Sequence, residues 1–240
     1  MSYFELENEL NMKNRIFGVK RINADQGAKN DGKCVMKLME RVLRGEETIF
    51  TADSAACVGY MSNTGFQSGC PNIPGGAEYF LSSGRGKGFP PGERIKKTPE
   101  IAKAYFDNYD RDVLKPYNAY RVTPYTEGCD AEIVWMFAAP DQLSALILLY
   151  EFRSSDSADD FIVSFASGCG SLFAQPYSQL KTERPRAIIG CTDIASRPYL
   201  DNNLLSLTVT HDRFREMLED TPECFFHGKF WNNFKDRRMF

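Results

Sequence analysis

Seven cysteines are the residues of this 240-residue chain best suited to chemistry. Four of them, Cys34, Cys57, Cys169 and Cys191, fall at the ends of predicted helices or strands. Two, Cys34 and Cys57, are predicted in the first turn of a helix, where unpaired backbone N–H groups favour a thiolate over a thiol. The thiolate is the form that binds metal or attacks an electrophile. The placement therefore indicates a metal site or reactive thiols, against the alternative that the cysteines only pack.

Glycines stand beside two of these thiols. Gly168 and Gly170 flank one of them, and Gly190 directly precedes another. Because glycine has no Cβ, its backbone amide can approach a cluster sulfide or an anionic group closely. We expect these three glycines to help bind a cofactor, and Arg197 to hold a carboxylate or phosphate.

The spacing of the cysteines excludes several common motifs. There is no C-x-x-C in the chain, so a zinc ribbon, a thioredoxin motif and a ferredoxin run are all absent. A nucleophilic cysteine usually needs a base, and the chain has only two histidines, His211 and His227. Any metal site must therefore be assembled from distant segments. A shared metal or cluster site, one or two reactive thiols, and plain packing all stay open at this point.

The composition is that of an ordinary globular protein, with 42% hydrophobic and 25% charged residues. No apolar run approaches the length of about 18 residues that a membrane helix requires, and the N-terminus has no apolar signal segment. A net charge of -3 gives no basic footprint for nucleic acid. We therefore expect a cytoplasmic protein with reduced thiols and with neither nucleic acid nor a membrane as a partner.

The apolar periodicity predicts one α+β domain over residues 1–240, with a mixed sheet flanked by helices. Strands are expected near residues 15–22, 119–125, 131–139, 161–166, 186–190 and 204–210, with a short one near 46–52. Helices are expected over residues 33–44, from 55 onward, over 98–109, from 140 onward and over 211–220. Asp31 is the expected cap of the first helix and Gly45 its end.

Residues 65–92 are rich in glycine, proline and serine and predict a long irregular loop. Within it, the run GRGKG at residues 84–88 could wrap a small anionic ligand. Its G-x-G-x-G spacing does not match the dinucleotide fingerprint. This loop is the main support for the alternative function, a non-redox ligand-binding or regulatory module.

The tail over residues 225–240 carries more aromatic side chains than a solvated terminus normally would. We expect it to dock on its own domain. The alternative is a contact with a second copy of the chain in a homodimer.

Several segments together resemble a known family. The segments are GKCVMKLMERVLRGEETIFTADSAACVGYMSNTGF, PDQLSALILLYEF, FASGCGSLFAQPY and IIGCTDIASRPYLDNN, followed by FREML. They are similar to the domain-of-unknown-function family 169, also labelled uncharacterised ArCR, from about Arg15 to about Leu218. The cysteines of that family pattern fall on Cys34, Cys57, Cys169 and Cys191, the same four that stand at predicted element ends.

The resemblance also places several other family positions on this chain. They are Pro140, Asp141 and Gln142, then Pro176 and Tyr177, then Gly190, Arg197 and Asp201. Two departures stand out. Many family members have a further cysteine where this chain has Ile194, and an acidic pair where it has Asn202 and Asn203. Any ligand or catalytic role of those two positions would be missing here.

The resemblance implies a fold and a site but names no reaction. With the placement of the thiols, it leads us to expect a cytoplasmic metal-binding protein with a 4Fe–4S cluster held by Cys34, Cys57, Cys169 and Cys191. Four cysteines could equally hold a structural zinc ion. A redox partner or a small anionic ligand would then be the expected partner.

Overall fold

The computed structural model describes residues 2–13, 15–30, 34–67, 73–107, 114–163 and 167–238. Their centre is a seven-stranded sheet in the order β2-β3-β1-β4-β7-β6-β5. Neighbouring strands are antiparallel except β5 and β6, which are parallel. The strands are β1 (Ile16–Ile22), β2 (Thr48–Thr51), β3 (Ala119–Pro124), β4 (Ile133–Ala138), β5 (Phe161–Ile162), β6 (Ala187–Gly190) and β7 (Leu205–Thr210). The predicted α+β class with a mixed sheet is confirmed.

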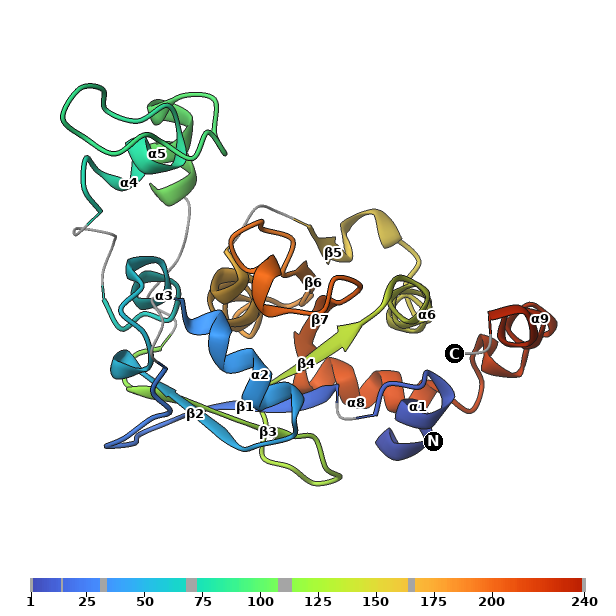
Figure 1. Cartoon of the computed structure of the whole chain (residues 1–240). Coiled ribbons are helices and arrows are strands. Elements are labelled where there is room, and N and C mark those ends of the chain that lie inside the picture. Colours follow the sequence, from blue (N-terminus) through green and yellow to red (C-terminus); the bar gives the residue numbers. More distant parts are fainter. Residues whose placement is uncertain are drawn as a thin grey trace.

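Short helices cover both faces of this sheet (Figure 1). The α-helices are α1 (Tyr3–Glu9), α2 (Met39–Leu43), α3 (Val58–Asn63), α4 (Ala77–Leu81), α5 (Pro99–Asp107), α6 (Pro140–Tyr150), α7 (Gln175–Gln179), α8 (His211–Asp220) and α9 (Lys229–Arg238). Single turns are η1 (Val35–Leu38), η2 (Ala52–Ser54), η3 (Ser157–Asp159), η5 (Arg197–Tyr199) and η6 (Phe225–His227), and η4 (Gly170–Ala174) is a π-helical turn. Of the helices within the described ranges, none is long and apolar enough to cross a membrane.

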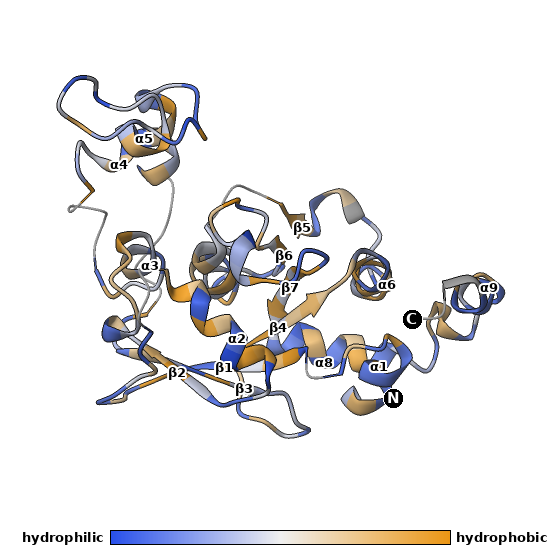
Figure 2. Cartoon of the chain, in the orientation of Figure 1, coloured by the Kyte–Doolittle hydropathy of each residue, from blue (hydrophilic) through white to orange (hydrophobic). Residues whose placement is uncertain are grey.

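Strand β4 lies in the middle of the sheet and is buried on both faces. Ile133, Trp135 and Phe137 point into one core, while the alternate residues Val134, Met136 and Ala138 point into the other. A strand with two buried faces loses the alternation of apolar and polar residues. This is why the sequence IVWMFA is apolar throughout, and why β4 is orange along its length in Figure 2.

The first core, called here the cysteine-side core, lies between the sheet and η1, α2, α3, η4 and α7. Phe173 stands at its centre, with ring centroids 5.1 Å from Trp135 and 4.6 Å from Tyr120. The indole Nε1 of Trp135 donates a hydrogen bond of 2.8 Å to the carbonyl of Leu172, within η4. This bond and the edge-on rings fix η4 against the sheet.

The second core lies on the opposite face, beneath α1, α6, α8 and α9. Trp231 of α9 is buried there, and its Nε1 donates a hydrogen bond of 2.6 Å to the carboxylate of Glu9 in α1. Lys235 lies 2.8 Å from the same carboxylate oxygen. The aromatic tail therefore docks on its own domain, as expected, and the homodimer stays a prediction.

The elements around the first two cysteines differ from the sequence prediction. The expected helix over residues 33–44 is a 3-10 turn, η1, followed by α2, and its expected cap Asp31 lies outside the described residues. The helix expected from Ala55 begins at Val58, because the backbone of Ala55 is extended.

Both termini form helices that the sequence did not predict. Helix α1 begins with a capping box, in which the Ser2 hydroxyl accepts from the Glu5 amide and the Glu5 carboxylate accepts from the Ser2 amide. Helix α9 has no clear apolar periodicity and gains its support from docking against α1. Tertiary packing commonly stabilises such short helices.

The predicted irregular loop over residues 65–92 is partly folded. Residues 73–107, called here the arm, contain α4 and α5, which pack against each other. In Figure 1 the arm stands clear of the sheet, beyond α3. Its GRGKG run forms the turn of a narrow loop, closed by a bridge between Gly84 and Pro91.

The docking of α9 can be tested by removing its acceptor. We expect Glu9→Ala to lower the free energy of unfolding by about 2 kcal/mol, since it removes the carboxylate that accepts from the Trp231 indole and pairs with Lys235. Chemical denaturation followed by tryptophan fluorescence measures this. Glu47→Ala, which removes an exposed carboxylate, is the control and should change stability by less than about 0.5 kcal/mol. Equal effects of the two changes would contradict the docking.

Candidate functional site

All four predicted cysteines stand at the ends of elements. Cys34 precedes η1, Cys57 is the N-cap of α3, and Cys169 directly precedes η4. Cys191 follows β6 with a left-handed φ of 57°. The first two are half-buried and the other two are buried, all in contact with the cysteine-side core.

Three of the thiols lie close enough for their charges to interact. Burial raises the pKa of Cys34 and of Cys169 most; the charge of Cys57 adds to both shifts, and that of Cys34 adds to the shift of Cys169. The carboxylate of Asp193 raises the pKa of Cys34 and also that of Cys191. The fold therefore brings Cys34, Cys57 and Cys169, from three distant segments, within electrostatic reach of one another, and Asp193 within reach of both Cys34 and Cys191.

The expectation that a helix start would favour a thiolate is wrong for Cys34, and the thiols of Cys169 and Cys191 are also held protonated. Burial is the largest influence on each: it raises the pKa of Cys169 to about 12 and that of Cys191 to about 11, and it also raises the pKa of Cys34. Removing a charge from water outweighs the field of helices only one or two turns long. Without a bound cation, these thiols therefore stay protonated at neutral pH.

The sulfur of Cys169 lies in a small polar network. The Ser167 hydroxyl is 3.1 Å from its Sγ, and the Asn63 amide Nδ2 is 3.5 Å from it. Asn63 Nδ2 also donates a hydrogen bond of 2.7 Å to the Ser167 Oγ. Hydrogen-bond donors around a sulfur stabilise the thiolate and tune any metal bound to it. The sequence analysis missed both partners, although Ser167 lies two residues before the cysteine.

Asp193 is a second residue that the sequence analysis missed, two positions after Cys191. Its Oδ1 accepts hydrogen bonds of 3.0 Å from the amides of Ala195 and Ser196. Its Oδ2 is buried and has no hydrogen-bond partner among the residues that the structure describes. A buried carboxylate oxygen without a partner is unfavourable, and it is suited to ligate or to stabilise a cation.

The glycines beside the thiols have a packing role. A Cβ on Gly168 would lie 2.8 Å from the sulfur of Met36, and a Cβ on Gly190 would lie 2.3 Å from the Cβ of Ser171. Real Cβ atoms essentially never approach so closely. Gly170 begins η4 and is buried. Close packing thus explains two of the three glycines, and their role toward a ligand stays a prediction.

Arg197 closes the loop between β6 and β7. Its guanidinium donates to the carbonyl of Asn202 at 2.6 Å, to that of Asp201 at 3.2 Å, and to that of Leu204. These bonds hold the segment after Cys191 in place. A ligand would have to compete with these carbonyls, so the predicted anion-binding role of Arg197 stays a prediction.

The thiols do not form a site for a single metal ion as they stand. Within the described residues, no three His, Cys, Asp or Glu side chains are placed to hold one ion. Cys70 lies outside those residues. The thiols of Cys34, Cys57 and Cys169 are therefore close enough to interact electrostatically. They are not placed closely enough to coordinate one metal ion together.

The two histidines do not provide an activated thiol. His211 Nε2 lies 3.0 Å from the hydroxyl of Tyr125, and Cys129 lies beside the same tyrosine. Burial raises the pKa of Cys129 and lowers that of His211, so both groups are neutral at pH 7. His227 lies in η6 and is exposed. The Cys–His arrangement therefore lacks the ionised pair that a thiol nucleophile uses.

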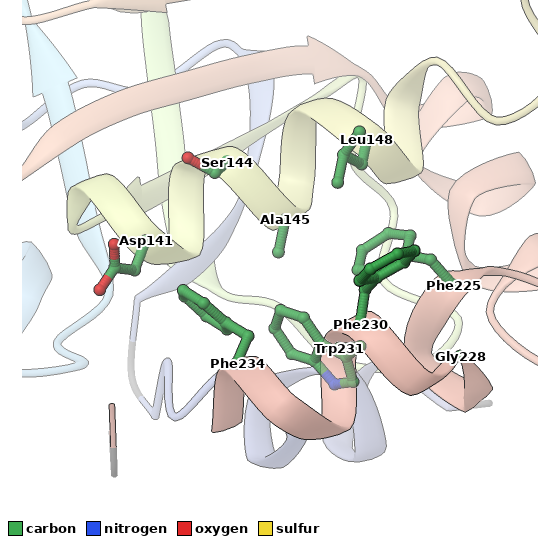
Figure 3. A pocket seen from close by; sticks show the side chains of 9 residues that line it. All are labelled: Asp141, Ser144, Ala145, Leu148, Phe225, Gly228, Phe230, Trp231 and Phe234. Carbon is green, nitrogen blue, oxygen red and sulfur yellow. The ribbon is translucent and has the colours of Figure 1, made fainter. Parts of the chain in front are cut away.

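An apolar groove of about 350 Å³ lies between α6 and the tail. Figure 3 shows the rings of Phe230, Trp231 and Phe234 turned toward α6, opposite Ala145 and Leu148. The rim is open, since 92% of the Phe230 surface is exposed. Apart from Asp141 and Ser144, which lie on one side of the groove, its lining is apolar, so the four cysteines remain the candidate site.

The family model for the domain of unknown function 169, described as uncharacterised ArCR, matches residues 5–220. The chain belongs to this family. No curated protein and no solved structure matches the chain. Because the matched region of family 169 includes all four thiols, Asp193 and the arm, these features lie inside the family domain, while η6 and α9 lie beyond its end.

The raised thiol pKa values predict an alkaline loss of stability in the metal-free protein. A folded-state pKa above the ordinary 9.0 stabilises the protein below about pH 9, and this contribution disappears as the pH rises toward 11 and 12. From about pH 8 to about pH 10, each buried thiol should account for about 1 kcal/mol of lost unfolding free energy.

Urea denaturation at the two pH values measures this effect. Cys169→Ala and Cys191→Ala should each flatten the pH dependence, whereas tyrosine ionisation, which is common to all variants, should persist. An unchanged slope in both variants would show that neither thiol is held protonated by burial.

Proposed function

We propose that this member of family 169 binds an iron–sulfur cluster, of the 4Fe–4S type, and has a redox or small-molecule-binding role. Cys34, Cys57 and Cys169 would supply three thiolates and Cys191 the fourth. The observation that carries the proposal is the convergence of the first three thiols from segments more than 20 residues apart in the sequence.

The charges around the thiols support a bound cation. The neighbours that act electrostatically on Cys34 and Cys169 are other thiols and the carboxylate of Asp193. If deprotonated, these groups would repel one another in a poorly hydrated place. A cationic metal centre compensates such a set of acids, and its binding releases the thiol protons.

The absence of a site for one ion among the described residues leads us to prefer a cluster to a zinc ion. A tetrahedral zinc site with Zn–S bonds of about 2.3 Å brings its sulfurs to within about 3.8 Å of each other. Within the described residues, the thiols are not placed to coordinate one zinc ion together. In a 4Fe–4S cluster, each thiolate binds a different iron, so the ligands stand farther apart.

The surrounding side chains suit this role. A cluster supplies one-electron transfer when bound. Ser167 and Asn63 would donate hydrogen bonds toward the sulfur of Cys169, which raises the potential of an iron–sulfur centre and stabilises its reduced form. The half-buried Cys34 and Cys57 place the site at the edge of the core, within reach of a redox partner.

The test is reconstitution of the full chain without oxygen, with iron and sulfide, followed by visible absorption and iron and sulfide analysis. Cys34→Ser, Cys57→Ser and Cys169→Ser should each abolish the visible band, because each removes a ligand. Comparing Cys191→Ser with Asp193→Asn identifies the fourth ligand. If Asp193 acts only beside the ligands, its change should weaken binding by about ten- to hundredfold.

The controls are Cys129→Ser and Cys224→Ser, which remove thiols that pack against the other core. Both should keep the full band. A colourless protein that binds zinc through the same cysteines would contradict the cluster and indicate a structural zinc site instead. A colourless, metal-free and stably folded protein would contradict the proposal and return the chain to the alternative of a non-redox binding or regulatory module.

A further inference from the structure

One loop of the arm is rich in positive charge. Residues 84–97 contain five Lys or Arg residues and one Glu, a net charge of +4, whereas the whole chain has a net charge of -3. Figure 2 shows this loop largely in the blue of hydrophilic residues. Four of its cations, Arg85, Lys87, Arg94 and Lys97, are exposed.

The four exposed cations of this loop lack an acidic partner among the described residues, whereas most arginines of the body have one. On the body, ion pairs hold Arg41, Arg44, Arg153, Arg184, Arg186 and Arg213 against carboxylates. On the arm, Arg85, Lys87, Arg94 and Lys97 form no ion pair with any residue that the structure describes. Their charge is therefore available to an anionic partner from outside.

An apolar centre lies among these charges. Phe89 is 46% exposed, and Pro90 and Pro91 after it are also exposed. The guanidinium of Arg85 lies 5.2 Å from the centroid of the Phe89 ring and 5.4 Å from that of the Tyr79 ring. An arginine held on aromatic rings, with a charged rim around it, is the usual composition of a protein-binding surface.

The arm presents this surface on a fixed support. Backbone bonds from Glu93 to Phe80 at 2.7 Å and from Lys96 to Leu81 at 2.8 Å fasten the loop to α4. A Cβ on Gly92 would lie 2.1 Å from the carbonyl of Ser82, so only glycine allows this closure. At the tip, Gly86 and Gly88 have positive φ angles and open space around them. The tip is therefore a projection with a well-defined base.

We propose that the arm is a docking surface for an acidic protein that presents carboxylates around exposed aromatic or apolar side chains. Charge complementarity selects an acidic partner, and the Arg85–Phe89 pair selects one with apolar groups among its charges. Single-stranded nucleic acid is normally bound in a basic groove lined by stacking rings, whereas this surface is a projecting tip. Its small size is typical of transient complexes.

The arm proposal does not depend on the cysteine site. The two are separated experimentally because Cys57→Ser should leave docking intact. If the cluster forms but the acidic probes do not bind, only the arm proposal is overturned. If the probes bind but no cluster forms, only the proposed cluster is overturned.

Fluorescence anisotropy with labelled polypeptides tests the docking, using the full chain at low salt. The probes are poly-glutamate and a random glutamate–tyrosine copolymer of equal charge. We expect the copolymer to bind more tightly and both to dissociate at about 0.5 M salt. Lys87→Glu with Lys97→Glu should weaken binding at least about tenfold. Lys13→Glu with Lys229→Glu, which reverses the same charge at exposed sites on the body, should change it less than about twofold.

Phe89→Ala supplies a second readout that charge alone does not move. It should remove most of the preference for the copolymer, about threefold or more, while leaving poly-glutamate binding unchanged. Circular dichroism checks that each variant folds. Equal weakening by the arm and body charge variants would overturn the proposal. So would tighter binding to an oligothymidylate of equal charge or to phosphatidylserine vesicles, or no preference for tyrosine.

Discussion

The burial of β4 on both faces is the constraint on which the rest of this structure depends. Its six residues point alternately into two cores, so each face must be covered by helices. Antiparallel pairing with β1 and β7 fixes the strand in the middle of the sheet. On one face, Trp135 then reaches η4 through its hydrogen bond to Leu172, and this places Cys169 at the edge of the cysteine-side core.

The same packing sets the state of the thiols. Desolvation dominates at Cys34, Cys169 and Cys191, so the protonated thiol is the stable form of the metal-free fold. A cation would reverse this preference, because it replaces water as the partner of the thiolate. Metal binding, proton release and folding are therefore linked at this site. The unpartnered Oδ2 of Asp193 adds a further acidic group whose burial a cation would relieve.

Positively charged side chains on the body and on the arm have different neighbours. Most arginines on the body pair with carboxylates, as Arg184 does with Asp160 at 2.5 Å. Arg85 and Lys87 at the tip of the arm have no such carboxylate in the part of the chain that the structure describes, and Arg85 packs on aromatic rings instead. An isolated protein gains little from unpaired surface charge. Such a distribution is more readily explained by a surface that meets a partner than by the stability of the fold.

The sequence by itself determined the α+β class, the main strands, helices α5, α6 and α8, and the placement of four cysteines at element ends. These features follow from local apolar periodicity, helix-capping residues and glycine, which act over a few neighbouring residues. Only the tertiary structure decided that Cys34, Cys57 and Cys169 lie within electrostatic reach of one another, that Asn63 contacts the Cys169 sulfur, and that η1 replaces a full helical turn. It also decided that burial, which raises the pKa of the thiols, has a larger effect than the helix N-termini, which would lower it. Desolvation and long-range contacts depend on which surfaces come together, and no pattern of neighbouring residues encodes them alone.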